Sequence, residues 1–470
     1  MIPDAPGVAV PSDGRRAAAG DTCSGLCLPE ASQLKSRGGV LTHGGCFAAL
    51  TSPGADVTLI RPLAAKSRIT SDARERSDSA VSYRLDSEST MRPAILSVAK
   101  MLGARSETWL YRQITCTPRH RVHVLAYKYL NRREYPHEPV TLVPWRETSS
   151  YRAAKLAAFL RGAGRPVFDF RQCKVLVRLL ADPSLKVVQA HFAGVACQVR
   201  EALSEAGRPF LAWFYGSDLF RLTGDSEAQV SRLAKSDSIF CCTSEALRLR
   251  AIELGCPSDR VHLHYLGVPV PTEVPERSPC SRLQVVSVGR LIDFKDPVGL
   301  VRVAAALKRR GVAFEWRHFG DGKLRPQVEE AVEESGLAGS VCLMGSCPQE
   351  SVLEGLRRAD VMVHNAVIAP DGGRESFGVA LAEAAGQGLP IVSAPVGGIP
   401  EIVVDRRTGF LVDNGSAEEM AERVDLLWKD PDLRASMGRA AHERAMALFE
   451  ADRQAEKLDC FYDSLVKSDG

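Results

Sequence analysis

Short apolar runs alternate with helix-forming stretches from residue 91 to the end of the chain. The first series of runs covers residues 94–99, 121–127, 187–192, 210–214, 238–243 and 261–266. The second covers residues 283–288, 314–319, 341–344, 361–363, 390–393 and 410–412. Such alternation is typical of parallel sheets with helices on both faces and right-handed connections. We therefore expect an α/β protein.

A proline-rich stretch at residues 269–279 separates the two series. Because 470 residues exceed what one core usually holds, the chain suits two α/β domains joined by this stretch. We expect a first domain over residues 91–270, a linker over 271–280, a second domain over 281–445 and a closing helix over 446–470.

The first ninety residues are rich in Gly, Ser, Ala, Asp and Arg and show no sustained period. They are interpreted as a disordered extension, or as an over-long gene start, because Met91 directly precedes the first apolar run. Zinc binding by Cys23, Cys27, His43 and Cys46 is an alternative, although their spacing matches no strong zinc signature. The thirteen scattered cysteines indicate reduced thiols in a cytoplasmic protein.

Two glutamates, Glu375 and Glu383, lie eight positions apart around the start of an expected helix. Residues 376–379 are expected to form its first turn, whose free N–H groups and positive dipole suit a phosphate. If the eight positions are helical, Glu383 lies about 12 Å from Glu375. This distance is about that between a hydroxyl group of the sugar and the ribose diol in a nucleotide-sugar. The spacing therefore predicts a nucleotide-sugar site, against the alternative of an ordinary amphipathic helix with exposed glutamates.

Two cations, Arg290 and Lys295, follow Gly289 at the carboxyl end of the run at 283–288. An open parallel sheet binds its ligand at such ends. An arginine can form two parallel hydrogen bonds to a pyrophosphate, and a lysine adds a point charge. Taken with the two glutamates, these residues favour diphosphate binding over a solvated pair of cations.

These motifs resemble the retaining glycosyltransferases of family 4, which have the GT-B architecture of two Rossmann-like parallel-sheet domains facing each other across a cleft. The resemblance includes Gly320 after a strand, residues 395–401 (Pro-Val-Gly-Gly-Ile-Pro-Glu) and residues 408–412, and is looser upstream. The branch that builds colanic acid and related exopolysaccharides is the most similar. The resemblance implies a closing helix that crosses back onto the first domain. It also implies a donor site formed by Gly289, Arg290, Lys295, Gly320, Glu375, Ser376, Phe377, Gly378, Val379 and Glu383.

The amino-terminal half is expected to hold the acceptor. The resemblance places His191 and Asp218 at the cleft, and Ser106 and Glu107 on an acceptor-side loop. Alternatives are a structural histidine, a loop cap for Asp218 and a helix N-cap for Ser106. Tyr215 is expected in the acceptor site with these residues, but it stands where the family usually has a histidine, which weakens the expectation of an imidazole contact to the donor sugar. Asp296 stands where a glycine commonly follows the lysine, and it brings an anion near the expected phosphate.

Positive charge is concentrated at residues 119–178, with thirteen basic and four acidic residues, although the whole chain carries only +3. Residues 151–161 can form a basic amphipathic helix, which suits a lipid-linked acceptor or an anionic membrane surface, or is simply a solvated face. We do not expect the chain to bind nucleic acid, because aromatic residues make up only 6 % of it and no known nucleic-acid-binding motif is present. We expect a cytoplasmic protein, peripheral at the inner face of the membrane, since no signal peptide or long apolar span is evident.

The expected reaction moves a hexose from a UDP- or GDP-type sugar to a polysaccharide precursor or lipid-linked acceptor. Arg290, Lys295 and the amides of residues 377–379 would stabilise the departing phosphate. Glu375 would position sugar hydroxyls, and His191 would line the reacting centre. The resemblance implies retention. Because no metal-binding Asp-x-Asp stands out near these groups, we expect a reaction without a metal or other cofactor. The alternatives are an epimerase or phosphorylase on the same frame, or a non-catalytic binder of sugar nucleotides.

Overall fold

The computed structural model describes residues 92–143, 174–203, 207–277 and 280–467. The expected disordered extension, the alternative zinc ligands from Cys23 to Cys46 and the expected basic helix at 151–161 all lie outside the described residues. Everything below concerns the described part of the chain.

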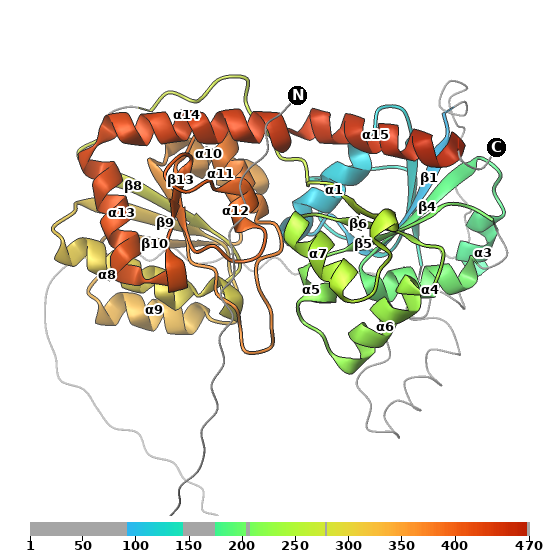
Figure 1. Ribbon diagram of the computed structural model, residues 1–470. Helices are drawn as coiled ribbons and strands as arrows, with labels where there is room; N and C mark the ends of the chain where they lie inside the picture. The colour runs from blue at the N-terminus through green and yellow to red at the C-terminus, as the bar shows by residue number, and fades with distance from the viewer. Residues whose placement is uncertain (1–91, 144–173, 204–206, 278–279, 468–470) are drawn as a thin grey trace, which may run out of the picture. The chain divides into compact units, whose positions relative to one another are not determined.

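The first sheet has seven parallel strands in the order β3-β2-β1-β4-β5-β6-β7 (Figure 1). Its strands are β1 (Ala94–Leu102), β2 (Arg121–Tyr129), β3 (Val140–Leu142), β4 (Leu185–His191), β5 (Phe210–Phe214), β6 (Ile239–Cys242) and β7 (Val261–Leu263). The connecting helices are α1 (Thr108–Thr115), α3 (Lys174–Leu180), α4 (Ala193–Ala202), α5 (Gly216–Leu219), α6 (Gly224–Ala234) and α7 (Glu245–Glu253). The order of the strands reverses between β1 and β4, which makes this a topological switch point.

The second sheet has six parallel strands in the order β10-β9-β8-β11-β12-β13. They are β8 (Leu283–Val288), β9 (Phe314–Phe319), β10 (Val341–Gly345), β11 (Val361–His364), β12 (Ile391–Ser393) and β13 (Gly409–Leu411). The helices of this domain are α8 (Pro297–Arg309), α9 (Arg325–Glu334), α10 (Gln349–Arg358), α11 (Val379–Gly386), α12 (Ile399–Ile402), α13 (Ala417–Lys429) and α14 (Pro431–Leu448).

Both sheets are buried on their two faces. In β1, Leu96 and Val98 belong to one hydrophobic cluster, while Ile95 and Ala99 belong to another on the opposite face. This follows from the period of two along a strand. A parallel sheet covered on both faces needs such nearly continuous apolar strands. The expected fold class, two parallel-sheet Rossmann-like domains in an α/β chain, is therefore confirmed.

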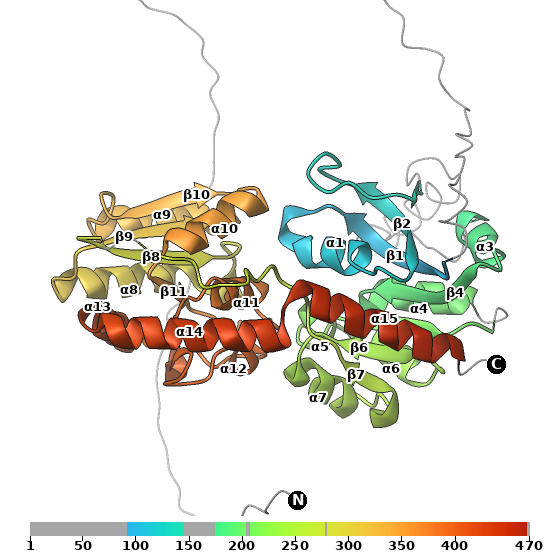
Figure 2. The same ribbon diagram turned by 90° about the horizontal axis from the view of Figure 1, so that it is seen from above.

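The last helix, α15 (Ala451–Lys467), follows α14 and packs against the first sheet (Figure 2). Leu458 and Tyr462 are buried in a core of that sheet, and the Tyr462 hydroxyl donates to Oε1 of Gln189 in β4 at 2.8 Å. Asp459 lies 2.6 Å from Nδ1 of His120. The closing helix of the chain thus completes a core formed by its first strands.

One of the alternatives was wrong, and one strand was not predicted. Ser106 is not a helix N-cap, because residues Arg105–Glu107 form a turn of 3-10 helix and α1 begins at Thr108 with Glu107 as its N-cap. The strand β3 was not predicted, because it lies at the edge of the sheet and its three residues are only half-buried, so no buried apolar run marks it.

Candidate functional site

The carboxyl edge of the second sheet brings two glycine loops into contact. Gly289 follows β8 and Gly320 follows β9. A Cβ atom on Gly320 would lie 1.9 Å from the Gly289 carbonyl oxygen, and Gly320 has a φ of +142°. A Cβ on Gly289 would lie 3.7 Å from Cδ of Lys295. Only glycine at position 320 allows the two loops to meet, so these predicted residues lie together.

Lys295 and Glu375 form a nearly buried ion pair at this edge. Nε2 of His364, the last residue of β11, lies 3.4 Å from the same carboxylate oxygen of Glu375. Burial alone would raise the pKa of Glu375, but Lys295 and His364 together hold that pKa well below its usual range. Glu375 is therefore a carboxylate at neutral pH, able to accept hydrogen bonds from hydroxyl groups.

Asp296 does not compete for the ammonium group of Lys295. Its carboxylate accepts the Gly299 N–H at 3.0 Å as the N-cap of α8, and it accepts Nδ2 of Asn365 at 2.8 Å. Its φ of +35° lies in the left-handed region, which favours glycine and explains why a glycine suits this position. The anion that was expected to weaken the Lys295 contact is thus turned toward α8.

The start of α11 differs from the prediction. The helix begins at Val379, and Gly378 precedes it with a φ of +99°, so Ser376, Phe377 and Gly378 form a loop and not a first turn. The expected helical span of 12 Å between the two glutamates therefore does not apply. The loop is held by the motif at 395–401, since a Cβ on Gly397 would lie 1.7 Å from the Glu375 carbonyl oxygen.

Glu383 is buried in α11, with 5 % of its surface exposed. Its Oε1 accepts a hydrogen bond from Nη2 of Arg112 at 3.0 Å and another from Nε2 of Gln349 at 2.8 Å. Arg112 comes from α1, so a residue of the first domain contacts the second glutamate of the predicted pair. Neither Arg112 nor Gln349 was predicted, and no local pattern in the sequence marks them.

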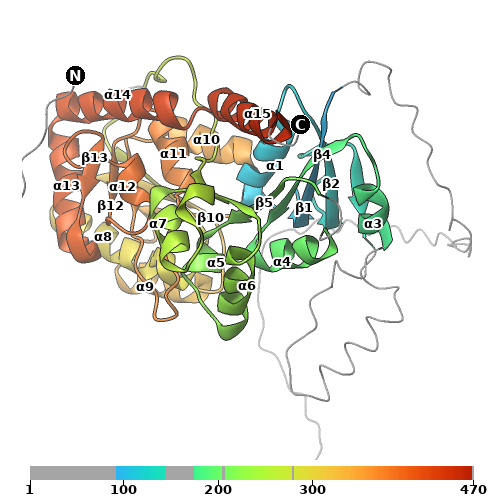
Figure 3. The same ribbon diagram turned by 45° about the vertical axis from the view of Figure 1, so that its right-hand side comes forward.

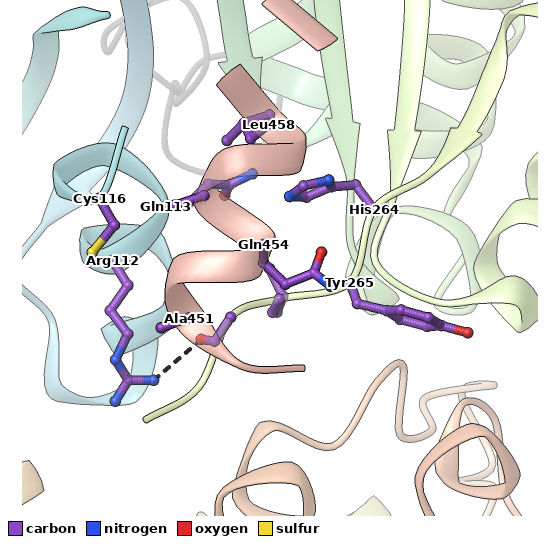
Figure 4. Close-up of a pocket in the computed structure, with 11 residues that line it drawn as sticks. Arg112, Gln113, Cys116, His264, Tyr265, Ala451, Gln454 and Leu458 are labelled. Carbon is purple, nitrogen blue, oxygen red and sulfur yellow. Dashed lines mark hydrogen bonds between the residues drawn. The ribbon is translucent and has the colours of Figure 1, made fainter. Parts of the chain in front are cut away.

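A small hollow of about 20 Å³ lies beside Arg112 (Figure 4). Arg112 and Gln113 line it from α1, His264 from the segment after β7, and Gln454 from α15, while the Tyr265 ring points away from them. Nη1 of Arg112 also donates to the Gly267 carbonyl at 3.5 Å. The guanidinium group is thereby held between the segment that leaves the first sheet and α11.

The expected acceptor-side loop lies near Arg290. Arg290 and Ser106 are exposed, and Glu107 is half-buried. Burial raises the pKa of Glu107, while the nearby charges of Arg290 and Lys100 act to lower it. Glu107, in the 3-10 turn of the first domain, is therefore close enough to Arg290 of the second domain for the two charges to interact.

His191 lies beneath the surface of the first domain. It is fully buried, and its ring nitrogens hydrogen-bond with Oγ of Ser97 at 2.9 Å and with the hydroxyl of Tyr215 at 2.8 Å. Burial lowers the pKa of His191 to about 3, so the ring is neutral. This placement favours the structural alternative, in which His191 supports Tyr215 from below.

Asp218 caps the turn that follows β5. Its Oδ2 accepts the Tyr215 N–H at 2.9 Å, and burial raises its pKa to about 7. The same turn touches the donor-side loop, because a Cβ on Gly216 would lie only 2.9 Å from Cβ of Ser376. The turn at 215–218 thus brings the predicted residues of the first domain against those of the second.

Within the described residues, no cluster of three or more His, Cys, Asp or Glu side chains is placed to hold a metal ion. None of the described helices has the length and apolar character that crossing a bilayer requires.

Comparisons with known proteins agree with this geometry. Residues 274–444 match the family model of the glycosyl transferases, group 1. The amylovoran biosynthesis glycosyltransferase AmsK of Erwinia amylovora is 30 % identical over 212 residues, which are 44 % of this chain and 52 % of that protein. A protein of Escherichia coli K12 named as a colanic acid biosynthesis glycosyltransferase, WcaL, is 28 % identical over 262 residues, which are 54 % of this chain and 64 % of that protein.

The chain thus spans between about half and two thirds of the length of these relatives. Among solved structures, Anabaena Alr3699/HepE in complex with UDP and glucose superposes with a TM-score of 0.62 at 18 % identity, over 79 % of this chain and all of that one. This likeness concerns the fold. The second sheet and its helices accordingly make up a domain of the glycosyl transferases group 1 family, in a chain that resembles exopolysaccharide-building relatives.

Proposed function

We propose that this chain is a retaining glycosyltransferase of family 4, which moves a hexose from a UDP- or GDP-type sugar to a polysaccharide precursor or a lipid-linked acceptor. The observation that carries the proposal is the buried pair of Lys295 and Glu375, beside the loops of Gly289 and Gly320 at the carboxyl edge of a parallel sheet. Ligands of open α/β sheets bind at this edge. The names of AmsK and WcaL support the reaction class and the exopolysaccharide setting.

The charges at this edge suit a leaving nucleoside diphosphate. Lys295 is nearly buried and Arg290 is exposed, and both follow β8 at the edge where a diphosphate would bind. Their positive charge would stabilise the negative charge that develops on the β-phosphate as the sugar departs. Glu375, kept ionised by Lys295, would position the sugar by accepting hydrogen bonds from its hydroxyl groups, and Glu383 would hold the ribose.

The proposal includes a reaction that needs no metal or other cofactor, with retention at the anomeric carbon. Retention would follow from attack on the face that the phosphate leaves, with that phosphate accepting the acceptor's proton. The enzyme would act in the cytoplasm, at the periphery of the membrane that carries the acceptor.

The test is a panel of UDP- and GDP-sugars incubated with the intact chain, with release of nucleoside diphosphate as the readout. We expect one donor to turn over with EDTA present, and NMR of the product to show an unchanged anomeric configuration. Arg290→Gln and Glu383→Gln should each lower kcat/KM at least 100-fold. Arg309→Gln, a control at an exposed arginine in the last turn of α8, should leave turnover unchanged.

Two results would refute the proposal. Tight binding of a sugar nucleotide without turnover under any acceptor would favour the non-catalytic binder. Conversion of the sugar on its nucleotide would favour an epimerase.

A further inference from the structure

A second hollow, with a volume of about 260 Å³, lies in the first domain. It is lined by Lys100, Tyr127, Phe192, Gly194, Val195, Gln198, Ser217, Asp218 and Gln229. Lys100 lies in β1, and Phe192 directly follows β4. The hollow therefore opens at the point where the strand order reverses, which is where open α/β sheets hold ligands. The helices α4, α5 and α6, which carry most of the other lining residues, are visible together in Figure 3.

The lining suits a ring that carries several hydroxyl groups. Ser217, Asp218 and Gln229 supply donors and acceptors, while Tyr127 and Phe192 supply apolar faces. Phe192 has a φ of +75°, which is costly for a residue with a Cβ. Backbone strain of this kind is concentrated at binding and catalytic sites.

Lys100 gives the hollow a positive charge. Its side chain is exposed, and among the described residues it forms neither a hydrogen bond nor a close ion pair. Its charge lowers the pKa of both Asp218 and Glu107 against the larger, opposing effect of burial. An ammonium group in a ligand-sized hollow, with no close partner in the described chain, is suited to an anionic group on the ligand.

The hollow adjoins the proposed donor site. Ser217 and Asp218 directly follow Gly216, whose backbone lies against Ser376 of the loop before α11. Although burial raises the pKa of Glu107, the charges of Arg290 and Lys100 both act to lower it, so the two cations lie near the same short segment. A molecule in the hollow would therefore lie beside the reacting end of a donor bound at the second domain.

We propose that this hollow binds the acceptor, and that the acceptor carries an anionic substituent, a carboxylate or a phosphate ester, which pairs with Lys100. The inference rests on the proposed function and names the chemical class of its second substrate. It assigns Lys100 and Gln229 to acceptor recognition.

The test measures binding of three probes to the intact chain by calorimetry and saturation-transfer NMR, without a sugar nucleotide present. The probes are glucose, glucuronate and glucose 6-phosphate. We expect at least one acidic probe to bind ten-fold more tightly than glucose. Preference for glucuronate would identify a carboxylate acceptor, and preference for glucose 6-phosphate a phosphate ester.

Two variants locate the site and its charge. Lys100→Gln should abolish the preference for the acidic probe. Gln229→Leu should lower the affinity of the chain for the acidic probe and for glucose to a similar degree. Lys186→Gln is the matched control, because Lys186 is an exposed lysine near the opposite end of β4. Equal affinity for glucose and both acids, or an acidic preference that survives Lys100→Gln, would overturn the inference.

Failure of this inference is separable from failure of the proposed function. The release of nucleoside diphosphate by water, measured without acceptor, depends on Arg290 and Glu383, and we expect Lys100→Gln to leave it within two-fold. If Lys100→Gln keeps donor hydrolysis and also keeps acidic binding, only the inference fails. If acidic probes bind through Lys100 but no sugar nucleotide turns over, only the proposed function fails.

Discussion

At the scale of single residues, burial and charge decide which side chains are ionised. Glu375 and Asp218 are both nearly buried carboxyl groups, with 8 % and 7 % of their surfaces exposed. Lys295 lies against Glu375 and stabilises its anion, whereas Asp218 has only backbone N–H groups and the more distant Lys100. The pKa of Glu375 therefore falls and that of Asp218 rises to about 7.

This difference predicts how the stability contributed by Asp218 changes with pH. The folded chain keeps the Asp218 proton up to about pH 7, while the unfolded chain releases it near the ordinary aspartate pKa of 3.8. The contribution is full at pH values below the unfolded pKa and is lost as the pH rises through the folded pKa. In Asp218→Asn this loss cannot occur, so the variant should gain up to about 4 kcal/mol relative to the wild type between pH 4 and pH 8.

Melting temperatures of both chains, measured at several pH values in that range, check this prediction. Asp225→Asn, which changes an exposed aspartate of α6 in the same domain, is the control. A difference between Asp218→Asn and the wild type that is constant across the range would contradict the assigned pKa.

At the scale of elements, the strands were predicted well where both faces are buried. Residues Phe210–Phe214, Leu283–Val288 and Phe314–Phe319 form strands with the predicted bounds. Phe210–Phe214 is wholly apolar and Leu283–Val288 mostly so, whereas Phe314–Phe319 also contains three polar or charged residues. A glycine directly follows the second and the third of these strands and marks their ends. The start of α11 was missed because Gly378 takes a left-handed φ, and that conformation is imposed by contacts with residues 397–402.

The candidate site shows the same division. Arg290, Lys295, Glu375 and Glu383 could be found because each lies in a short motif at a strand or helix end. Arg112 could not, because its contact with Glu383 joins residues 271 positions apart and depends on how α1 packs. For His191 the motif suggested a residue of the cleft, but the structure buries the ring and pairs both of its nitrogens with Ser97 and Tyr215.

The short helix α5 yields a prediction about a close contact. In Gly216→Ala the new Cβ would lie 2.9 Å from Cβ of Ser376, so the turn and the donor-side loop must separate. Overpacking of this kind costs about 1–3 kcal/mol. We expect a lower melting temperature and a slower release of nucleoside diphosphate.

The double variant Gly216→Ala with Ser376→Gly removes the opposing Cβ and should recover most of both losses. Gly224→Ala is the matched control, since a Cβ at the first residue of α6 meets nothing within 4 Å. If the double variant is as impaired as Gly216→Ala alone, the contact with Ser376 is not the cause.

At the scale of the whole molecule, polar contacts join the two sheet domains at several points. Arg112 contacts Glu383, Arg221 forms an ion pair with Asp371, and α15 packs on the first sheet directly after α14. Glu401 makes a further contact, because its carboxylate accepts the N–H groups of Glu245 and Ala246 at 2.8 and 3.1 Å. A carboxylate from the second domain therefore caps α7 of the first, where the helix dipole favours an anion.

These two amides can report whether the domains remain in contact in solution. The first N–H groups of a helix have no partner within it, so the protection of Glu245 and Ala246 depends on Glu401. The next amide, that of Leu247, is held at 3.1 Å by Oγ of Ser244 from the same domain and serves as an internal control. In Glu401→Ala, hydrogen exchange should become at least ten-fold faster at Glu245 and Ala246 and stay unchanged at Leu247. Equal acceleration at all three amides would mean that α7 frays as a unit, and no change at any would mean that the domains do not meet through Glu401.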